Sequence, residues 1–305
     1  MYCTMGLAFA KVVFSIGLGY LSFVPHRPKI LRIMTSPLPR ILMCPPDYFG
    51  IEYEINPWMD RTHPVCHETA VRQWESLRGI LDGLGAVIEL VEPQPRLPDL
   101  VFTANAALIF GRKAVLSRFR HLQRQGEEQY FAARLEQLGF SVVHLPDDEY
   151  FEGAGDALFC GDSLFAGYRI RSTARSLQHV AALIGEQVIP LELIDNRFYH
   201  LDTCFCPVNS STAIWFPAAF DDYGKQVVRA SVPNLITLEE AEAANFAANA
   251  VVIGRHVVTN TGCPQLHDQL RGQGFNPVAT PLGEFVKAGG SAKCLTLRLD
   301  GEEAA

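Results

Sequence analysis

One cysteine near the end of the sequence has the surroundings of a nucleophile. Cys294 lies in AGGSAKCLTLRL, between a Gly-Gly-Ser turn and a short apolar segment. A flexible loop that leads into a strand presents its side chains at the strand end, where scaffolds often carry catalytic groups. A free cysteine also packs well as a small buried apolar residue. Its role therefore depends on the residues that the fold brings next to it.

A distant histidine and two carboxylates could supply the rest of the chemistry. His200, in YHLDTCFCPV, suits a proton shuttle for a cysteine nucleophile, because such pairs are defined by geometry and not by sequence adjacency. Glu152 and Asp156, in FEGAGDALF, would repel a thiolate unless the substrate brings positive charge. A guanidinium is such a group, since its planar fork of N–H donors pairs with carboxylate oxygens. Together these residues predict covalent chemistry on a cationic guanidine.

These residues are far apart in the sequence, so repeated elements must bring them together. Four segments have the apolar spacing of an amphipathic helix, followed by a glycine and an apolar strand. The marker glycines are Gly85, Gly139, Gly185 and Gly274, and each would supply the left-handed backbone that a helix end prefers. The first three are about 50 residues apart, and the last interval is about twice as long.

A fifth copy is expected in the long interval. Thr237 and Glu240 have the spacing of a capping box, which would begin another helix there. Five units of this length predict a closed ring of small α/β modules, and a single α/β sheet with coincidental spacing is the alternative. In a ring, equivalent positions of successive units converge on the axis. The ring would therefore bring Asn105 to the cysteine, the histidine and the carboxylates.

Six motifs, in order along residues 37–299, resemble the guanidine-modifying superfamily. They are MCPPDYFGIEYEINPWM, FTANAALIF, LSRFRHLQRQGEE, FEGAGDAL, YHLDTCFCP and GGSAKCLTL. The resemblance implies the α/β fold of that superfamily, a five-bladed pseudo-symmetric ββαβ propeller (the pentein fold) with a central active-site channel. It also implies a guanidino-group hydrolase, because the superfamily contains arginine deiminase, dimethylargininase, amidinotransferases and the arginine dihydrolases.

The resemblance also assigns roles to individual residues. It implies that Cys294 is the nucleophile, that His200 is the general acid and base, and that Glu152 grips the guanidinium. The predicted substrate-binding residues are Asn56, Asn105, Arg124, Asp156, Arg171 and Ser291. The two arginines are expected to take the carboxylate of an amino-acid substrate.

The implied mechanism is covalent and calls for no metal and no cofactor. Cys294 attacks the guanidinium carbon, and His200 protonates the departing amine. A water that His200 deprotonates then hydrolyses the resulting thiouronium. Because acidic neighbours disfavour a thiolate, we expect the thiol to ionise only when the cationic substrate is bound.

Asn105 bears on which member of the superfamily this chain resembles most. Deiminases and dimethylargininases usually have a carboxylate at this place, whereas the TAN sequence also occurs in the dihydrolases. An amide both donates and accepts hydrogen bonds, so it matches a neutral ureido group as well as a guanidinium. We therefore expect an arginine dihydrolase, which converts L-arginine to ornithine, two ammonia and carbon dioxide. The alternatives are dimethylargininase, arginine deiminase and, from another class, a non-catalytic ribosome-binding propeller.

The composition is that of an ordinary globular protein. The 305 residues are 48% hydrophobic and 19% charged, with a formal net charge of −7. Nucleic-acid binding requires a concentrated basic face, so we expect no nucleic-acid partner. The eight cysteines have neither the paired spacing of a zinc site nor the density of a disulfide scaffold. We expect a cytoplasmic protein whose partner is a small guanidino substrate, and a homo-oligomer stays open.

The first 33 residues differ from the rest of the chain. MGLAFAKVVFSIGLGYLSFV is mostly apolar and is followed by basic residues. About twenty apolar residues can span a bilayer, so residues 1–33 could be a membrane anchor. The other interpretation is that translation begins at Met34 and that the extension is a start-site artefact. We predict a single catalytic α/β-propeller domain at residues 34–305, with membrane contact only if the extension is an anchor.

Overall fold

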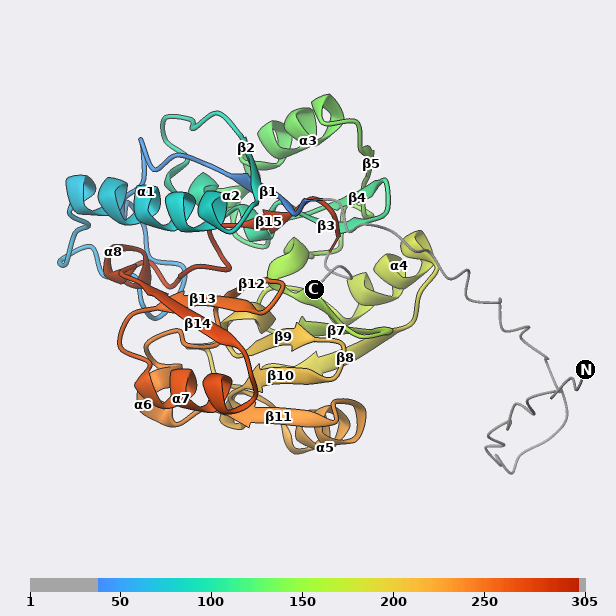
Figure 1. Ribbon diagram of the computed structural model, residues 1–305. Coiled ribbons are helices and arrows are strands. Elements are labelled where there is room, and N and C mark those ends of the chain that lie inside the picture. Colours follow the sequence, from blue (N-terminus) through green and yellow to red (C-terminus); the bar gives the residue numbers. More distant parts are fainter. Residues whose placement is uncertain (1–37, 302–305) are drawn as a thin grey trace, which may run out of the picture. The chain divides into compact units, whose positions relative to one another are not determined.

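The computed structural model describes residues 38–301, which form five sheets of three strands each (Figure 1). The first sheet joins both ends of this range, with β1 (Arg40–Met43) between β2 (Val87–Leu90) and β15 (Leu297–Arg298). The other sheets follow in sequence order: β3 (Ala107–Phe110), β4 (Lys113–Leu116) and β5 (Ser141–Val143); β6 (Ala157–Cys160), β7 (Ser163–Tyr168) and β8 (Val188–Glu192); β9 (Phe205–Asn209), β10 (Thr212–Trp215) and β11 (Asn234–Thr237); β12 (Val251–Ile253), β13 (His256–Asn260) and β14 (Asn276–Thr280). Figure 1 shows the sheets one after another around a common centre.

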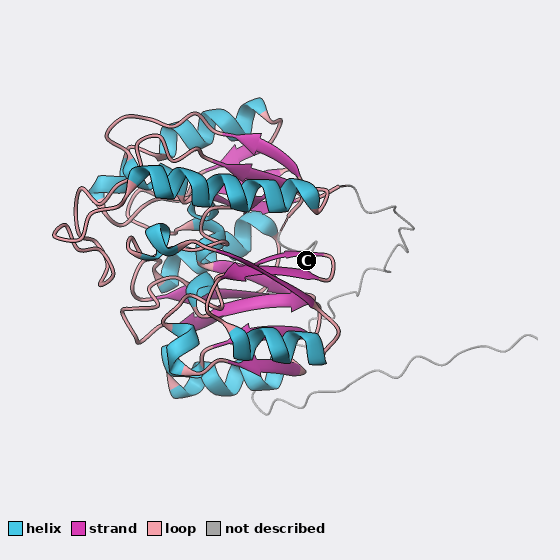
Figure 2. Ribbon diagram, turned by 60° about the vertical axis from the view of Figure 1, so that its left-hand side comes forward, coloured by secondary structure: helices cyan, strands magenta, loops and turns pink. Residues whose placement is uncertain are grey.

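All five sheets have the same connectivity. The first two strands of each sheet are antiparallel, and the middle strand pairs with the last in parallel. A parallel pair needs a crossover connection, which is helical in every unit. The crossover helices are α1 (His67–Gly83), α3 (Glu128–Gln137), α4 (Ala174–Ile184), α5 (Asp222–Ser231) and α7 (Pro264–Gly272). Figure 2 shows these helices flanking the strands, and the predicted five-bladed ββαβ propeller is confirmed.

Four of the five crossover helices end at the predicted glycines. Gly85, Gly139, Gly185 and Gly274 have φ angles of 88°, 85°, 78° and 80°. This left-handed backbone is strained for other residues, and glycine adopts it freely. The helix, glycine and strand pattern is therefore confirmed in these four units.

The capping box predicted from the spacing of Thr237 and Glu240 does not form, although a short helix does begin at Glu240. Thr237 is the last residue of β11, and its hydroxyl accepts a hydrogen bond from Trp215 Nε1 at 3.0 Å. The segment after it forms only the one-turn helix α6 (Glu240–Ala243), whose first turn has no side-chain cap. The threonine hydroxyl is already occupied by the neighbouring strand, so it caps no helix.

The crossover helix of this unit is α5, which lies before β11. It begins after Asp221, whose side chain accepts a hydrogen bond from the backbone N–H of Gly224 at 2.8 Å. It ends at Val232, which has extended backbone angles (φ −108°, ψ 113°). No left-handed residue is needed there, so no glycine marks the end of this helix.

The turn that carries Cys294 is anchored in the apolar core. Helix α1 buries one face, with Trp74, Leu77 and Leu81 at 4% exposure or less. These side chains belong to the same apolar cluster as Cys294 and Leu295. Burying a large apolar side chain stabilises a fold by about 1.5–3 kcal/mol. The backbone around the cysteine is therefore set by the packing of the first unit against the last.

Short turns before the first strands of four units carry or adjoin several of the predicted site residues. The 3₁₀ turns η2 (Thr103–Asn105), η3 (Gly153–Gly155) and η4 (Leu201–Thr203) come before β3, β6 and β9. The one-turn helix α8 (Gly283–Val286) begins the corresponding segment before β15. Because the units repeat around one centre, these turns lie close together.

The predicted N-terminal extension, residues 1–33, lies outside the described residues. Its separation from a catalytic domain at residues 34–305 therefore stays a prediction. Within residues 38–301, no helix is both long enough and apolar enough to cross a bilayer.

Candidate active site

Five of the nine predicted site residues line one small cavity. They are Asn56, Asn105, Arg124, Arg171 and Cys294. Each comes from a different part of the sequence: the segments after β1 and β7, the turns before β3 and β15, and helix α2 (Leu122–Gln125). The ring therefore brings them together as the sequence predicts.

Glu152 and His200 contact this cavity through Arg171. His200 Nε2 lies 2.6 Å from Glu152 Oε2, and Arg171 Nη1 donates a hydrogen bond to the same oxygen at 3.1 Å. The side chains of all three residues are at most 2% exposed. Because an ionised carboxylate only accepts hydrogen bonds, the short contact assigns a proton to Nε2 of the histidine.

Burial and charge act in opposite directions on this pair. Burial alone would raise the pKa of the Glu152 carboxyl, but Arg171 and His200 hold it well below its usual value. Burial lowers the pKa of His200 to about 4, although the hydrogen bond with Glu152 acts to raise it. At neutral pH the carboxyl is therefore ionised and the imidazole is neutral, which is the form that can accept a proton.

Both ends of the Asn105 amide form hydrogen bonds. Its Oδ1 accepts a hydrogen bond from Arg124 Nη1 at 3.0 Å, and its Nδ2 donates to the backbone oxygen of Glu152 at 3.3 Å. Arg124 is in turn held by Glu127 at 2.8 and 3.0 Å. Burial raises the pKa of the Glu127 carboxyl to about 7, although Arg124 acts to lower it. A donor on one side and an acceptor on the other fix the orientation of the amide.

Cys294 is buried between an amide and a carboxylate. Its Sγ accepts a hydrogen bond from Asn249 Nδ2 at 3.1 Å and lies 3.6 Å from Asp202 Oδ2. Burial raises the pKa of the thiol well above its usual value, Asp202 raises it further, and Asn249 opposes them. The thiol is therefore neutral at pH 7 and points its proton toward Asp202. A cation in the cavity would favour the thiolate.

Asn56 fixes the segment that forms another wall of the cavity. Its Nδ2 donates to the backbone oxygen of Ala288 at 3.1 Å, and its Oδ1 accepts from the backbone N–H of Trp58 at 2.9 Å. Arg171 Nη2 donates to the backbone oxygen of Ile55 at 3.0 Å. This wall is therefore tied both to the turn before β15 and to the Glu152 network.

Asp156 and Ser291 do not line the cavity. Asp156 accepts hydrogen bonds from the backbone N–H of Leu201 at 3.0 Å and from the Ser172 hydroxyl at 2.6 Å. It thus orders the turn that follows the histidine. Ser291 donates its backbone N–H to Asn249 at 3.1 Å, and its hydroxyl has no hydrogen-bond partner among the described residues. Asp156 thus lies beside the His200 segment and Ser291 beside the Cys294 segment, and their part in substrate binding stays a prediction.

Asp99 is a cavity residue that the predicted set lacks. It lies in the 3₁₀ turn η1 (Pro98–Val101) and lines the same cavity as Cys294. Its Oδ2 accepts a hydrogen bond from the Tyr53 hydroxyl at 3.0 Å, and its Oδ1 has no partner within residues 38–301. Burial raises the pKa of this carboxyl, and Arg124 opposes the shift. No sequence pattern singles it out.

Asp202 and Asn249 are also missing from the predicted set, although the sequence holds a signal for each. Asp202 is two residues after the candidate histidine, in the segment HLD. Asn249 lies in FAANA, residues 246–250, which repeats FTANA, residues 102–106. The repeat is easily overlooked because the strand after the first copy is one residue longer before its Gly-Arg turn.

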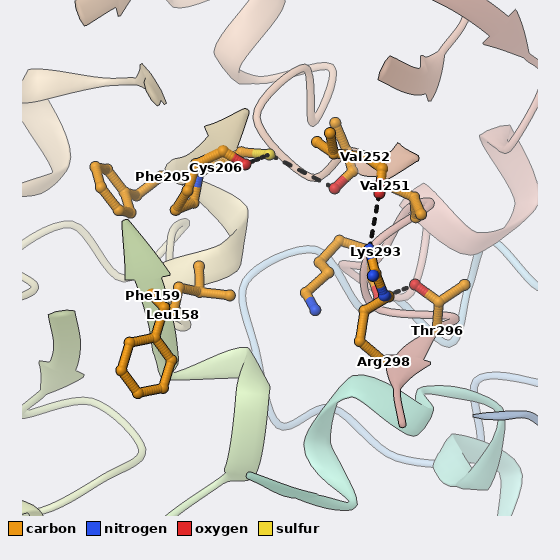
Figure 3. A pocket seen from close by; sticks show the side chains of 11 residues that line it. Leu158, Phe159, Phe205, Cys206, Val251, Val252, Lys293, Thr296 and Arg298 are labelled. Carbon is orange, nitrogen blue, oxygen red and sulfur yellow. Dashed lines mark hydrogen bonds between the residues drawn. The ribbon is translucent and has the colours of Figure 1, made fainter. Parts of the chain in front are cut away.

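A second cavity is lined by none of the predicted site residues (Figure 3). Apolar side chains of β6, β9 and β12 form much of its wall, and Lys293, Thr296 and Arg298 gather on one side. Arg298 Nη1 donates to the backbone oxygen of Val252 at 3.0 Å. Lys293 and Cys294 are adjacent in the sequence but line different cavities, so this turn lies between the two.

No group of three or more His, Cys, Asp or Glu within residues 38–301 is arranged to hold a metal ion.

Comparison with protein-family models places the chain among guanidine-modifying enzymes. The model described as N,N dimethylarginine dimethylhydrolase, eukaryotic, matches residues 45–299. The chain belongs to the dimethylarginine dimethylhydrolase family. The N(G),N(G)-dimethylarginine dimethylaminohydrolase of Mycobacterium tuberculosis is 40% identical over 260 residues, which are 85% of either chain. The resemblance to the guanidine-modifying superfamily is confirmed by this family membership.

A second group of relatives comes from cyanobacteria. ArgZ of Synechocystis, a bifunctional arginine dihydrolase/ornithine cyclodeaminase, is 48% identical over 265 residues, which are 85% of this chain and 37% of ArgZ. The chain thus spans less than two fifths of that relative. A crystal structure of the N-terminal domain of ArgZ, a cysteine-to-serine variant bound to its substrate, has a TM-score of 0.84 at 47% identity. That comparison covers 86% of this chain and 98% of the domain.

Proposed function

We propose that this protein is an arginine dihydrolase, which converts L-arginine to ornithine, two ammonia and carbon dioxide. The observation that carries the proposal is a neutral amide, Asn105, on the wall of the cavity that contains Cys294. The likeness to the N-terminal domain of ArgZ, itself an arginine dihydrolase, supports the same activity.

The charges around the cavity complement those of arginine. Asp99 supplies a buried carboxylate oxygen without a hydrogen bond, which suits the α-ammonium group. Glu152 already holds one guanidinium, that of Arg171, at 3.1 Å. A substrate guanidinium can take that place while Arg171 turns to the α-carboxylate, because the fork of an arginine side chain pairs with carboxylates in two parallel hydrogen bonds.

The first hydrolysis follows from the protonation states of the two catalytic side chains. A bound guanidinium offsets the charge of Asp202, so the Cys294 proton can pass to the neutral His200. The thiolate then forms a bond to the guanidinium carbon, the bond to one terminal nitrogen breaks, and His200 returns the proton to the leaving ammonia. His200 next deprotonates a water, whose oxygen bonds to the same carbon. The carbon–sulfur bond breaks, and the product is citrulline.

The second hydrolysis repeats these steps on the ureido group. Asn105 can donate to the ureido oxygen and accept from its nitrogen, which an ionised carboxylate cannot do. The thiolate displaces the remaining terminal nitrogen as ammonia, and a second water releases the carbon as a carbamate of ornithine. The carbamate loses carbon dioxide. Two waters are consumed for each arginine, and the thiol and the imidazole return to their starting states.

A product assay on the full chain tests this proposal. L-arginine is supplied, and ammonia, citrulline and ornithine are quantified over time. We expect ornithine with about two ammonia per arginine, as the two hydrolyses require. Citrulline with one ammonia and no ornithine would contradict the proposal and indicate a deiminase.

Dimethylargininase is the second candidate. It is favoured by the family model over residues 45–299 and by the mycobacterial relative, which spans this chain almost throughout. Asymmetric dimethylarginine in a parallel assay separates the two activities. Release of dimethylamine and citrulline from that substrate, with no turnover of arginine, would favour this second candidate.

We also propose the kind of partner and the location of the protein. The partner is a small guanidino compound and not a nucleic acid, because a formal net charge of −7 does not favour binding to phosphates. A cytoplasmic location is supported by the seven free cysteines within the described range, since reducing compartments keep thiols unpaired.

A further inference from the structure

Both ends of the Asn249 amide form hydrogen bonds with the segment that contains Cys294. Its Nδ2 donates hydrogen bonds to Cys294 Sγ at 3.1 Å and to the backbone oxygen of Asp202 at 3.0 Å. Its Oδ1 accepts from the backbone N–H groups of Ser291 and Cys294, both at 3.1 Å. The residue is fully buried. One side chain therefore holds the cysteine by its sulfur and by its backbone.

The backbone of Asn249 holds the other side of the same turn. Its carbonyl oxygen accepts a hydrogen bond from the N–H of Lys293 at 3.2 Å. Lys293 lines the second cavity (Figure 3), whereas the next residue, Cys294, lines the first. Asn249 thus contacts the turn where successive side chains face different cavities, and it fixes which of them reaches the substrate.

The titratable groups that face Cys294 determine how much a hydrogen bond to its sulfur matters. Asp202 of η4 lies nearest, at 3.6 Å, and Tyr199 precedes η4. The remaining charged groups around the same cavity are Asp99 of η1, Arg124 of α2 and Arg171 after β7. A neutral thiol can donate its proton to Asp202, but a thiolate cannot and is repelled by it. The N–H of Asn249 is therefore a contact that gains strength when the sulfur ionises.

We propose that Asn249 is a positioning residue that aims Cys294 Sγ into the cavity and stabilises its thiolate with an N–H hydrogen bond. This inference rests on the proposed function, in which the thiolate is the nucleophile. An amide suits the position because only a side chain with both donors and acceptors can bind the sulfur and two backbone N–H groups together. A carboxylate would keep the backbone contacts and lose the donor.

Two substitutions separate these contributions. The side chain of Asn249→Ser is too short to reach the sulfur or the two backbone N–H groups, and it adds no charge. Asn249→Asp keeps an acceptor for the backbone N–H groups but replaces the donor to sulfur with a negative charge. Asn260→Asp is the matched control. Asn260 is also a buried amide, and its Oδ1 accepts from the backbone N–H groups of Thr261 and Leu282 at 2.9 and 3.0 Å.

The readout is the pH dependence of Cys294 reactivity in the full chain. The rate of iodoacetamide labelling is measured from pH 6 to 10 by mass spectrometry of the peptide that contains Cys294, beside the pH profile of kcat/KM. We expect the thiol pKa to rise by at least about one unit in Asn249→Ser and further in Asn249→Asp, so that labelling at pH 8 slows about tenfold or more. Asn260→Asp should leave both profiles unchanged.

An unchanged pH profile in Asn249→Ser, with the protein folded, would overturn the inference. Loss of activity with an unshifted profile would also overturn it and leave only a structural role. If Asn249→Asp does not fold, the neutral serine variant still decides. Failure of the proposed function gives a different result, because it appears as the absence of ornithine in the product assay of the native protein, whereas the labelling of Cys294 is measured without substrate.

Discussion

The segments FTANA, residues 102–106, and FAANA, residues 246–250, have nearly the same sequence and precede equivalent strands, β3 and β12. Asn105 lines the cavity that contains Cys294 and accepts a hydrogen bond from Arg124, whereas Asn249 contacts the sulfur of Cys294. The same amide therefore lines the cavity in one unit and contacts the cysteine sulfur in another. The residues that face each asparagine determine what its amide contacts.

The difference also shows why a ring of similar units suits this chemistry. Each unit brings one turn to the centre, so a single motif can be used several times in one cavity. An amide is useful in both places because it donates and accepts hydrogen bonds at once. In the mechanism proposed above, Asn105 would match a substrate that changes from cationic to neutral, and Asn249 would match a sulfur that changes from neutral to anionic.

The largest expected effect comes from replacing Cys294, whose sulfur contacts Asn249. Cys294→Ser replaces the thiol with a hydroxyl, which is a weak nucleophile at its ordinary pKa, so turnover should fall by at least about 1,000-fold. Arginine binding, measured by calorimetry, should persist because the carboxylates and arginines of the cavity remain. Turnover within about tenfold of the native rate would break the assignment of the nucleophile.

Asn105→Asp tests the substrate-facing copy. A carboxylate cannot donate to a ureido oxygen, so the second hydrolysis should slow by about 100-fold while the first continues. Chromatography of the products should then show citrulline accumulating with about one ammonia per arginine. Native yields of ornithine would show that the amide does not govern the second step.

Gly155→Ala, in the neighbouring turn η3, should disturb the position of Asn105. A Cβ at Gly155 would collide with Asn105 Nδ2 and lie 3.6 Å from the ring of His200. The amide must shift, so ornithine formation should fall by about tenfold. Gly79→Ala in α1, where a Cβ meets nothing within 4 Å, is the control and should keep the native rate. Equal rates in the two variants would mean that the orientation of Asn105 is unimportant.

The smallest expected effect concerns the histidine between the two copies. Its pKa is about 4 in the folded protein and near 6.5 in an unfolded chain, so the unfolded state binds more protons between these pH values. Stability should therefore fall by about 2 kcal/mol between pH 7 and pH 5 from this group alone. Urea unfolding of His200→Gln should lack that part of the loss. The same pH dependence in both proteins would contradict the neutral, buried imidazole.

Much of the fold is encoded in local patterns. Gly85, Gly139, Gly185 and Gly274 mark four helix ends because a left-handed residue is needed there. The unit with α5 has no such residue, since Val232 continues in extended backbone, and its helix cannot be located from a glycine. Local signals therefore find an element only where its end imposes a backbone requirement.

The site is harder to predict than the fold, for a related reason. Cys294, His200 and Glu152 are residue types whose chemistry stands out in a sequence. Asp99 and Asn249 are common polar residues whose importance comes from burial and from the atoms opposite them. The position of a hydrogen-bond partner from another unit is set by ring closure, and no local sequence pattern contains it.

In the proposed mechanism, one cysteine carries out both hydrolyses. Arginine labelled with ¹³C at the guanidino carbon is mixed with the protein, the reaction is stopped with acid on the millisecond scale, and the peptide containing Cys294 is analysed by mass spectrometry. We predict two labelled adducts on that peptide, a thiouronium and then a thiocarbamate, which differ by the exchange of NH for O. Rapid formation of ornithine with no labelled Cys294 at any time would contradict the account.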